Sequence, residues 1–235
     1  MSKKNFYSNR VANIRETLVH ANLSFLQGLP EEKRRALLAK GIILYKKTDS
    51  LLFMDATPVK SIWIIVSGQV KLSVTDNDGN EQILGIFSDM EVIWESLFLP
   101  DSRYPYSGIC LTPVTVCAIP VTDFRRILED PDISFNIITL LSAKLRDANR
   151  RNTMLSSKSP ESRLIRLLLY YGKRTENTLV QLKLNDIAAS LSLRPETVSR
   201  KLHKLMKEGL IERAGRGKIR ILNYDALQDK LEDEY

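Results

Sequence analysis

Residues 195–201 read PETVSRK and bring together a proline, a carboxylate, two hydroxyls and two basic side chains, and further bases follow at His203, Lys204 and Lys207. An arginine can donate two hydrogen bonds to guanine, a carboxylate can accept one from cytosine, and a hydroxyl can do either. Lysines suit phosphates, whose contacts add affinity without reading sequence. These residue types on one surface predict recognition of double-stranded DNA.

The apolar spacing predicts that this surface belongs to the second of two short helices. Residues 184–191 form the first, and Pro195 begins the second, which runs to about Glu208 and ends before Gly209. Val198, Leu202 and Leu205 recur at i, i+4 and i+7, so they face inward and leave the polar side chains outside. Two short helices joined by a tight turn predict a helix-turn-helix motif.

A basic hairpin follows directly, with residues 210–213 and 218–221 on either side of Gly215-Arg216-Gly217. A helix-turn-helix pattern alone is a weak signal, but a basic wing behind it makes the prediction strong. The alternative to DNA binding is that these charged residues form an ordinary solvated helix face. For His203, DNA contact and the absence of any specific role are equally well supported by the sequence. The expected DNA contacts are Arg194, Glu196, Thr197, Ser199, Arg200, Lys201, His203, Lys204, Arg216 and Lys218.

The net charge of +7 is concentrated in the last third of the 235 residues. Residues 1–150 hold 18 Lys and Arg against 17 Asp and Glu, a net charge of +1, whereas residues 151–235 hold 17 against 11, a net charge of +6. This distribution is typical of a domain that binds a polyanion. The sequence has no apolar run long enough for a membrane span and no signal-peptide pattern, so we expect a cytoplasmic protein.

Two different spacings of apolar residues predict the secondary structure that precedes the DNA-binding domain. From about Gly41 to Pro120, apolar residues alternate in short runs, which predicts the β-strands of a sandwich or barrel. Residues 132–157 instead carry a narrow a/d stripe, which predicts a dimerisation helix, with a helix lying on its own domain's core as the alternative. The predicted dimer seam is Ile138, Leu141, Leu145, Ala148, Asn152 and Leu155. We expect a β-roll domain over residues 1–130 with flanking helices, a dimerisation helix over 131–157 and a DNA-binding domain over 158–235.

In this order of elements the chain resembles the family of bacterial regulators typified by the cyclic-AMP receptor protein and the fumarate-nitrate reduction regulator. The resemblance covers about residues 20–225 and rests on IWIIVSGQVKLSVTDNDGNEQIL, ETVSR and KLMKEGLI. ETVSR matches the family's E-T-x-x-R pattern, which implies base contacts by Glu196, Ser199 and Arg200. The implied fold is α+β, with a cyclic-nucleotide-binding-like β-roll (jelly roll), a long dimerisation helix and a winged helix-turn-helix. The implied function is that of a homodimer that binds a palindromic promoter site and acts with RNA polymerase.

The chain departs from the family where cyclic AMP would be held. Family members that bind this ligand hold its phosphate with a Gly-Glu pair and an Arg-Ser pair. Here Trp94-Glu95 takes the first place and Tyr104-Pro105 the second, with Arg103 one position away. We therefore expect an effector pocket at Trp94, Glu95, Arg103 and Tyr104 and an effector other than cyclic AMP, whose identity stays open.

No cofactor, metal site or catalytic residue is expected. Cys110 and Cys117 are too few for a four-thiolate cluster and are expected in the core, with a redox pair as the alternative. The only histidine ahead of the DNA-binding helix is His20, which argues against a haem. An enzyme has no support, because phosphate-binding glycine loops and nucleophile elbows are missing from the sequence. The competing function is a cyclic-nucleotide-type regulatory module that acts on a protein partner, and the winged helix argues against it.

Overall fold

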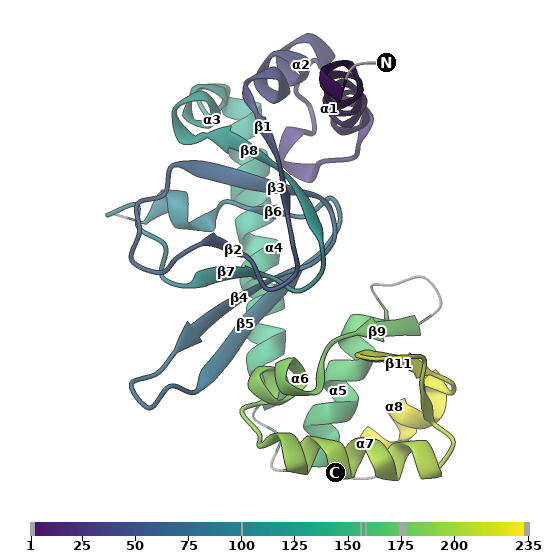
Figure 1. Cartoon of the computed structure of the whole chain (residues 1–235). Helices are drawn as coiled ribbons and strands as arrows, with labels where there is room; N and C mark the ends of the chain where they lie inside the picture. Colours follow the sequence, from purple (N-terminus) through teal and green to yellow (C-terminus); the bar gives the residue numbers. More distant parts are fainter. Residues whose placement is uncertain (1–2, 100, 156, 158, 174–177, 233–235) are drawn as a thin grey trace. The chain divides into compact units, whose positions relative to one another are not determined.

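The structure of the chain is a computed structural model that describes residues 3–99, 101–155, 157, 159–173 and 178–232 (Figure 1). The chain divides into two compact units, residues 1–74 with 84–145 and residues 75–83 with 146–235. The long helix α4 (Pro131–Leu155) contributes to both units. Within the described ranges, none of the helices has both the length and the apolar character needed to cross a membrane.

Two four-stranded sheets form the β-roll of the first unit, with strand orders β1-β8-β3-β6 and β2-β7-β4-β5. Gly68 and Gly79 have φ values of +97° and +83°, which is why glycine occupies the two predicted turns beside β4. The strands are β1 (Ile42–Lys46), β2 (Leu51–Phe53), β3 (Ser61–Ser67), β4 (Val70–Thr75), β5 (Glu81–Phe87), β6 (Val92–Ile93), β7 (Ser107–Cys110) and β8 (Val114–Pro120).

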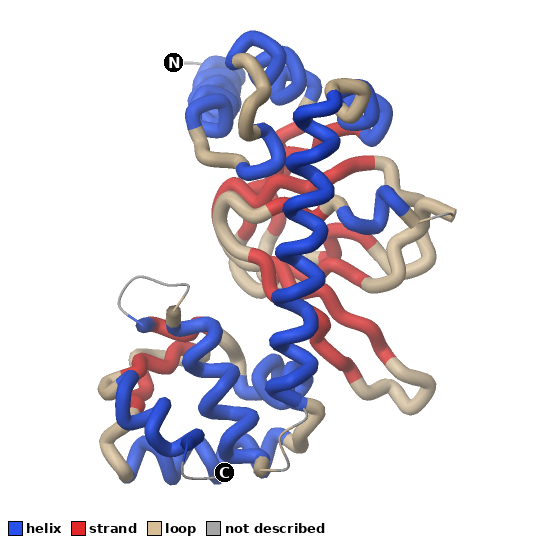
Figure 2. The backbone as a smooth tube through the Cα atoms, turned by 180° about the vertical axis from the view of Figure 1, so that it is seen from behind, coloured by secondary structure: helices blue, strands red, loops and turns tan. Residues whose placement is uncertain are grey.

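Strand β3 contributes to two separate hydrophobic cores because its side chains alternate between its two faces. Ile62 and Ile64 pack on the helical side, next to Cys117 of the neighbouring strand β8. Ile65 instead belongs to the cluster between the two sheets. The helical side is covered by α1 (Lys3–His20), α2 (Glu31–Lys40), α3 (Val121–Ile127), the 3-10 turn Ser24–Leu26 and the first half of α4, which crosses in front of the roll strands in Figure 2.

The second unit packs helices around a three-stranded sheet of order β10-β11-β9. Strands β10 (Ile211–Arg213) and β11 (Lys218–Ile221) are the predicted hairpin. Strand β9 (Leu179–Gln181) pairs with β11 and was not expected, because three residues are too few to show an alternating pattern. The helices are α5 (Pro160–Gly172), α6 (Leu184–Leu191), α7 (Pro195–Lys207) and α8 (Tyr224–Glu232).

Candidate nucleic-acid interface

The turn between α6 and α7 is built from backbone hydrogen bonds. Ser192 ends α6 in the left-handed conformation, with φ +51°, and the Leu193 N–H donates to the Ala188 carbonyl at 3.0 Å. Pro195 then occupies the first turn of α7, where its missing N–H costs nothing. Gly209, with φ +72°, closes the other end of the helix. These features agree with the two predicted helices and their boundaries.

One edge of α7 anchors the helix in the second unit. Val198, Leu202 and Leu205 are each at most 4% exposed. They bury the side of α7 that faces α5 and α6, while the remaining sides of the helix carry mostly polar residues. Because successive residues of a helix are rotated by about 100°, burial of this edge fixes the direction of every other side chain. We call α7 the recognition helix.

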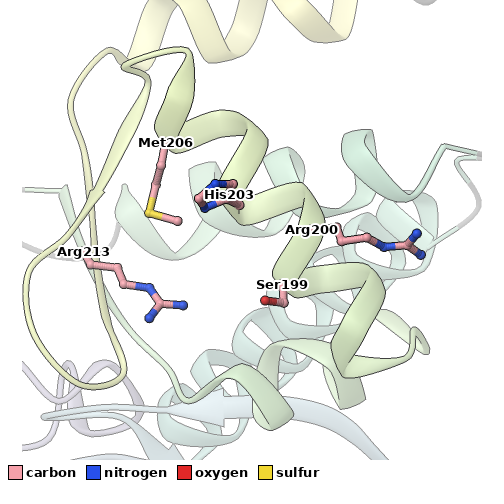
Figure 3. A pocket seen from close by; sticks show the side chains of 5 residues that line it. All are labelled: Ser199, Arg200, His203, Met206 and Arg213. Atoms are coloured by element: carbon pink, nitrogen blue, oxygen red, sulfur yellow. The ribbon is translucent and has the colours of Figure 1, made fainter.

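An open hollow of about 540 Å³ lies between the recognition helix and the hairpin that follows it, with Ser199, Arg200, His203, Met206 and Arg213 around it (Figure 3). Arg213 reaches towards the hollow from β10, and the Ser199 hydroxyl points into it from the helix. The Arg200 guanidinium points away from Arg213 and Met206. The predicted readers Ser199 and Arg200 therefore face different directions.

The start of the recognition helix holds the other predicted contacts. Arg194 and Glu196 are exposed, and Thr197 is half-buried. The Arg194 carbonyl accepts hydrogen bonds from the N–H groups of Thr197 and Val198, at 3.0 and 3.2 Å, so the first turn is fixed by its own backbone. The side chains of Arg194 and Glu196 project into solvent from this hydrogen-bonded first turn.

Lys201 and Lys204, expected at phosphates, are both paired with Glu161 of α5. Their Nζ atoms lie 3.0 and 2.8 Å from its carboxylate oxygens. Burial alone would raise the pKa of the Glu161 carboxyl, but the hydrogen bonds from Lys204 and Lys201 outweigh it and hold that pKa below its usual value. The hydrogen bond to Glu161 likewise raises the pKa of Lys204.

The predicted wing is the hairpin β10-β11. Gly215 and Gly217 have φ values of +122° and +68°, and the Ala214 N–H donates to the Lys218 carbonyl at 3.0 Å. Arg216 is exposed at the tip, and Lys218 is half-buried. A tight turn with two positive-φ positions is best served by glycine, which explains the Gly-Arg-Gly sequence.

Sequence reasoning missed Met206 and placed Arg213 only among the basic residues of the wing. Both side chains line the hollow. The missed signal is helical spacing, since Ser199, His203 and Met206 follow one another at steps of four and three residues and so share one side of the helix. Arg213 could be placed there only once the hairpin was known to fold back beside the helix.

The predicted effector residues Trp94 and Tyr104 lie in two different hydrophobic clusters, at 3% and 4% exposure. Tyr104 stacks on Phe53 at a ring distance of 4.0 Å, and its hydroxyl accepts a hydrogen bond from Trp63 at 2.8 Å. Arg103 is exposed and donates to the Ala56 carbonyl at 2.6 Å. The structure therefore does not bring Trp94 and Tyr104 together. The side chain of Glu95 lies outside the described residues.

Trp94 contributes to the contact between the roll and α4. The Lys144 ammonium lies 5.4 Å from the Trp94 ring and 4.9 Å from the Phe87 ring, and donates to the Val92 carbonyl at 2.9 Å. The negative faces of the two rings attract the ammonium, and the carbonyl accepts one of its hydrogen bonds. Lys144 thus fastens α4 to the end of β6.

The other side of α4 exposes large apolar side chains. Phe135, Ile138 and Leu145 are 69%, 59% and 63% exposed. Phe135 was not part of the predicted seam, although it lies three residues before Ile138 and extends the same stripe. Of the remaining seam residues, Asn152 is exposed, Leu141 and Ala148 are half-buried, and the side chain of Leu155 lies outside the described residues.

The two cysteines are buried in different clusters, Cys117 under the helices and Cys110 between the sheets. Burial raises the pKa of Cys117 to about 11 and also raises that of Cys110, which disfavours the reactive thiolate. Within the described part of the chain, no three His, Cys, Asp or Glu residues are grouped so that they could hold a metal ion.

Comparisons with known proteins match both units. Residues 43–130 match the cyclic nucleotide-binding domain, and residues 162–230 match the Crp-like helix-turn-helix domain. The probable transcriptional regulator flp of Lacticaseibacillus casei is 30% identical over 71% of this chain and 77% of that protein. The cyclic AMP receptor protein of Thermus thermophilus is 26% identical over 76% of this chain and 82% of that protein. The structure of FixK2 from Bradyrhizobium japonicum superposes with a TM-score of 0.74 at 20% identity, over 80% of this chain and 96% of that one.

The position of Arg213 beside the hollow gives a first prediction. We expect Arg213→Ala to weaken binding to all duplex sequences and to reduce the slope of log affinity against log salt by about 0.9 for each phosphate that this arginine neutralises. Fluorescence anisotropy at several salt concentrations measures this slope. Arg220→Ala is the matched control, because Arg220 pairs with Glu212 at 2.6 Å on the neighbouring strand. An equal decrease of the slope in both variants would contradict the assignment.

Proposed function

The chain belongs to the family of bacterial transcription regulators typified by the cyclic-AMP receptor protein and the fumarate-nitrate reduction regulator, and we propose that it acts as a homodimer on a palindromic promoter site. The recognition helix reads the bases, the wing binds phosphates, and the roll senses a signal other than cyclic AMP. Its protein partner is RNA polymerase, and its place of action is the cytoplasm.

The observation that carries this proposal is the set of outward-facing side chains on a helix whose apolar edge is buried and whose two ends are defined by Pro195 and Gly209. The anchored edge of the recognition helix leaves Glu196, Ser199 and Arg200 on the sides that a major groove could contact. A carboxylate, a hydroxyl and a guanidinium can together distinguish base pairs there. Arg213, with Arg216 at the tip of the wing, supplies positive charge next to them, as phosphate contacts require.

The exposed stripe of α4 supports the homodimer. Large apolar side chains at Phe135, Ile138 and Leu145 are costly to leave in water, at about 25 cal/mol for each Å² of apolar surface. The same helix packs on the roll through Ile133, Ile137 and the half-buried seam residue Leu141, so Phe135, Ile138 and Leu145 are the side chains left exposed for a second copy. A two-fold dimer places two recognition helices in symmetric positions, and a symmetric DNA site matches such a pair.

The residues at the expected phosphate-binding positions of the roll support an effector other than cyclic AMP. A cyclic phosphate needs N–H donors and a cation. Tyr104 is instead buried in an aromatic stack, and burial raises its pKa, so its hydroxyl stays neutral. Trp94 is packed against Phe124 and Lys144 on the helical side of the sheet. Arg103, the nearest cation along the chain, already donates to a backbone carbonyl.

For the dimer, we expect Leu145→Glu to place two like charges against each other in the seam. An unpaired charge in such an interface costs about 3 kcal/mol, so the dimer dissociation constant should rise by about 100-fold or more, and DNA affinity should fall with it. Analytical ultracentrifugation at micromolar concentration measures the mass. Thr122→Glu adds the same charge at an exposed position of α3, outside the stripe, and should leave the dimer intact. Equal dimer dissociation constants for Leu145→Glu and the unchanged protein, measured over a dilution series, would rule out this seam.

For base reading, selection of binding sites from random DNA is the direct test of the proposed function. Arg200→Ala should cost about 1–3 kcal/mol per half-site and relax the preference at one guanine, because the arginine reads a base edge. Arg216→Ala should weaken all sequences about equally and flatten the salt slope by about one. If Arg200→Ala keeps the preferred sequence while Arg216→Ala changes it, the roles of helix and wing are assigned wrongly.

For the effector, calorimetry with cyclic AMP should show no binding at tens of micromolar ligand, because neither Trp94 nor Tyr104 can replace the phosphate donors. A dissociation constant in the millimolar range corresponds to a binding free energy of about −4 kcal/mol, and such weak binding gives no signal at these ligand concentrations. Arg103→Ala serves as the comparison. Submicromolar binding that is abolished in Arg103→Ala would refute the prediction and identify Arg103 as the phosphate-binding cation.

A further inference from the structure

Glu161, in the first turn of α5, is the centre of an ion-pair network that reaches three elements of the second unit. Its carboxylate accepts hydrogen bonds from Lys201 and Lys204 of the recognition helix, at 3.0 and 2.8 Å. The Lys230 ammonium of α8 lies 3.9 Å from Glu161 and 3.1 Å from Glu208. Three ammonium groups thus share two carboxylates behind the recognition helix.

The network occupies the side of the recognition helix that faces away from the hollow. With a rotation of about 100° per residue, Lys201 lies about 160° and Lys204 about 140° around the helix from Ser199. Lys201 and Lys204 therefore lie on the opposite side from Ser199, while Arg200, about 100° from Ser199, lies next to Lys204 at a spacing of four residues. Three sides of one helix have three separate roles: an apolar anchor, a reading surface and an ionic anchor.

Glu161 is much less exposed to water than the two lysines that it pairs with. Its side chain is 13% exposed, against 34% for Lys201 and 51% for Lys204. A carboxylate that has given up most of its water stays ionised only when hydrogen-bonded cations replace that water. Both lysine ammonium groups donate to it, so removing Glu161 would take the hydrogen-bond acceptor from both and leave Lys204 with only the Glu208 carboxylate, 3.9 Å away.

We propose that Glu161 is a positioning residue for DNA reading, which holds Lys201 and Lys204 away from the phosphates of bound DNA. While this network is intact, the phosphate contacts come from the wing and from the start of the helix. The two lysines then add nothing to sequence-independent affinity, which favours the specific site over other DNA. The inference deepens the proposed function, because it concerns how the same helix discriminates between sequences.

The test measures the salt dependence of binding by the full-length protein to a random-sequence duplex and to its preferred site. In the otherwise unchanged chain, Lys201→Gln or Lys204→Gln should leave the slope of log affinity against log salt unaltered. Glu161→Gln should steepen that slope by about 0.9 for each lysine that reaches a phosphate. The ratio of specific to random affinity should fall. The triple variant Glu161→Gln/Lys201→Gln/Lys204→Gln should restore the original slope.

Asp229→Asn is the matched control, since it removes one negative charge from the exposed surface of α8 and should change neither slope nor ratio. A slope that flattens by about 0.9 in Lys201→Gln or Lys204→Gln overturns the proposal, as does an unchanged slope in a folded Glu161→Gln. If Glu161→Gln does not fold, as shown by the loss of cooperative unfolding on heating, the salt slopes of Lys201→Gln and Lys204→Gln still decide whether the two lysines contact phosphates. A wild-type protein without preference for any site would contradict the proposed function, whereas the slopes on random DNA would still test Glu161.

Discussion

The burial of one apolar edge on the recognition helix is the constraint on which the DNA-facing surface depends. The three side chains of that edge are almost fully buried, and truncating such a residue costs about 2–5 kcal/mol. No rotation of the helix can keep them buried and also change what its other sides present. Ser199 therefore faces the wing, Arg200 faces outward, and the lysines at 201 and 204 face Glu161. The sides of the helix differ in role because a single packing contact has fixed their directions.

Local signals allowed the sequence to predict this motif closely. The first helix was expected over residues 184–191 and the second from Pro195, and the structure has both, because Pro195, Gly209 and the apolar spacing all act within a few residues. The partner of Lys201 could not be predicted in the same way. Glu161 lies 40 residues earlier in the chain and reaches the lysine only through the packing of α5 against α7. Contacts of this kind follow from tertiary structure, so a run of bases reads as a phosphate-binding surface until the fold is known.

In the roll, too, the sequence predicted the local elements but not the tertiary contacts of individual side chains. Its strands and turns were predicted from alternation and glycine positions, and the family resemblance was correct. The resemblance also placed Trp94 and Tyr104 in one effector pocket, whereas their side chains lie in different cores. Neither residue lies in a strand, since Trp94 directly follows β6 and Tyr104 precedes β7. The alternating pattern of the strands therefore carries no signal for the core into which each ring packs. The exposed Phe135 of α4 was not predicted, because the apolar stripe on that helix was identified only from Ile138 onwards.

The two cores of the roll have an optical consequence. The chain contains two tryptophans, and the fold assigns one to each core. Trp63 donates its indole N–H to the Tyr104 hydroxyl between the sheets, and Trp94 lies beside the Lys144 ammonium where α4 meets the roll. The intrinsic fluorescence of this protein thus combines two emitters with different neighbours, a phenol for one and a cation for the other. Replacing either indole by phenylalanine would separate a signal from the interior of the roll from a signal at its junction with the long helix.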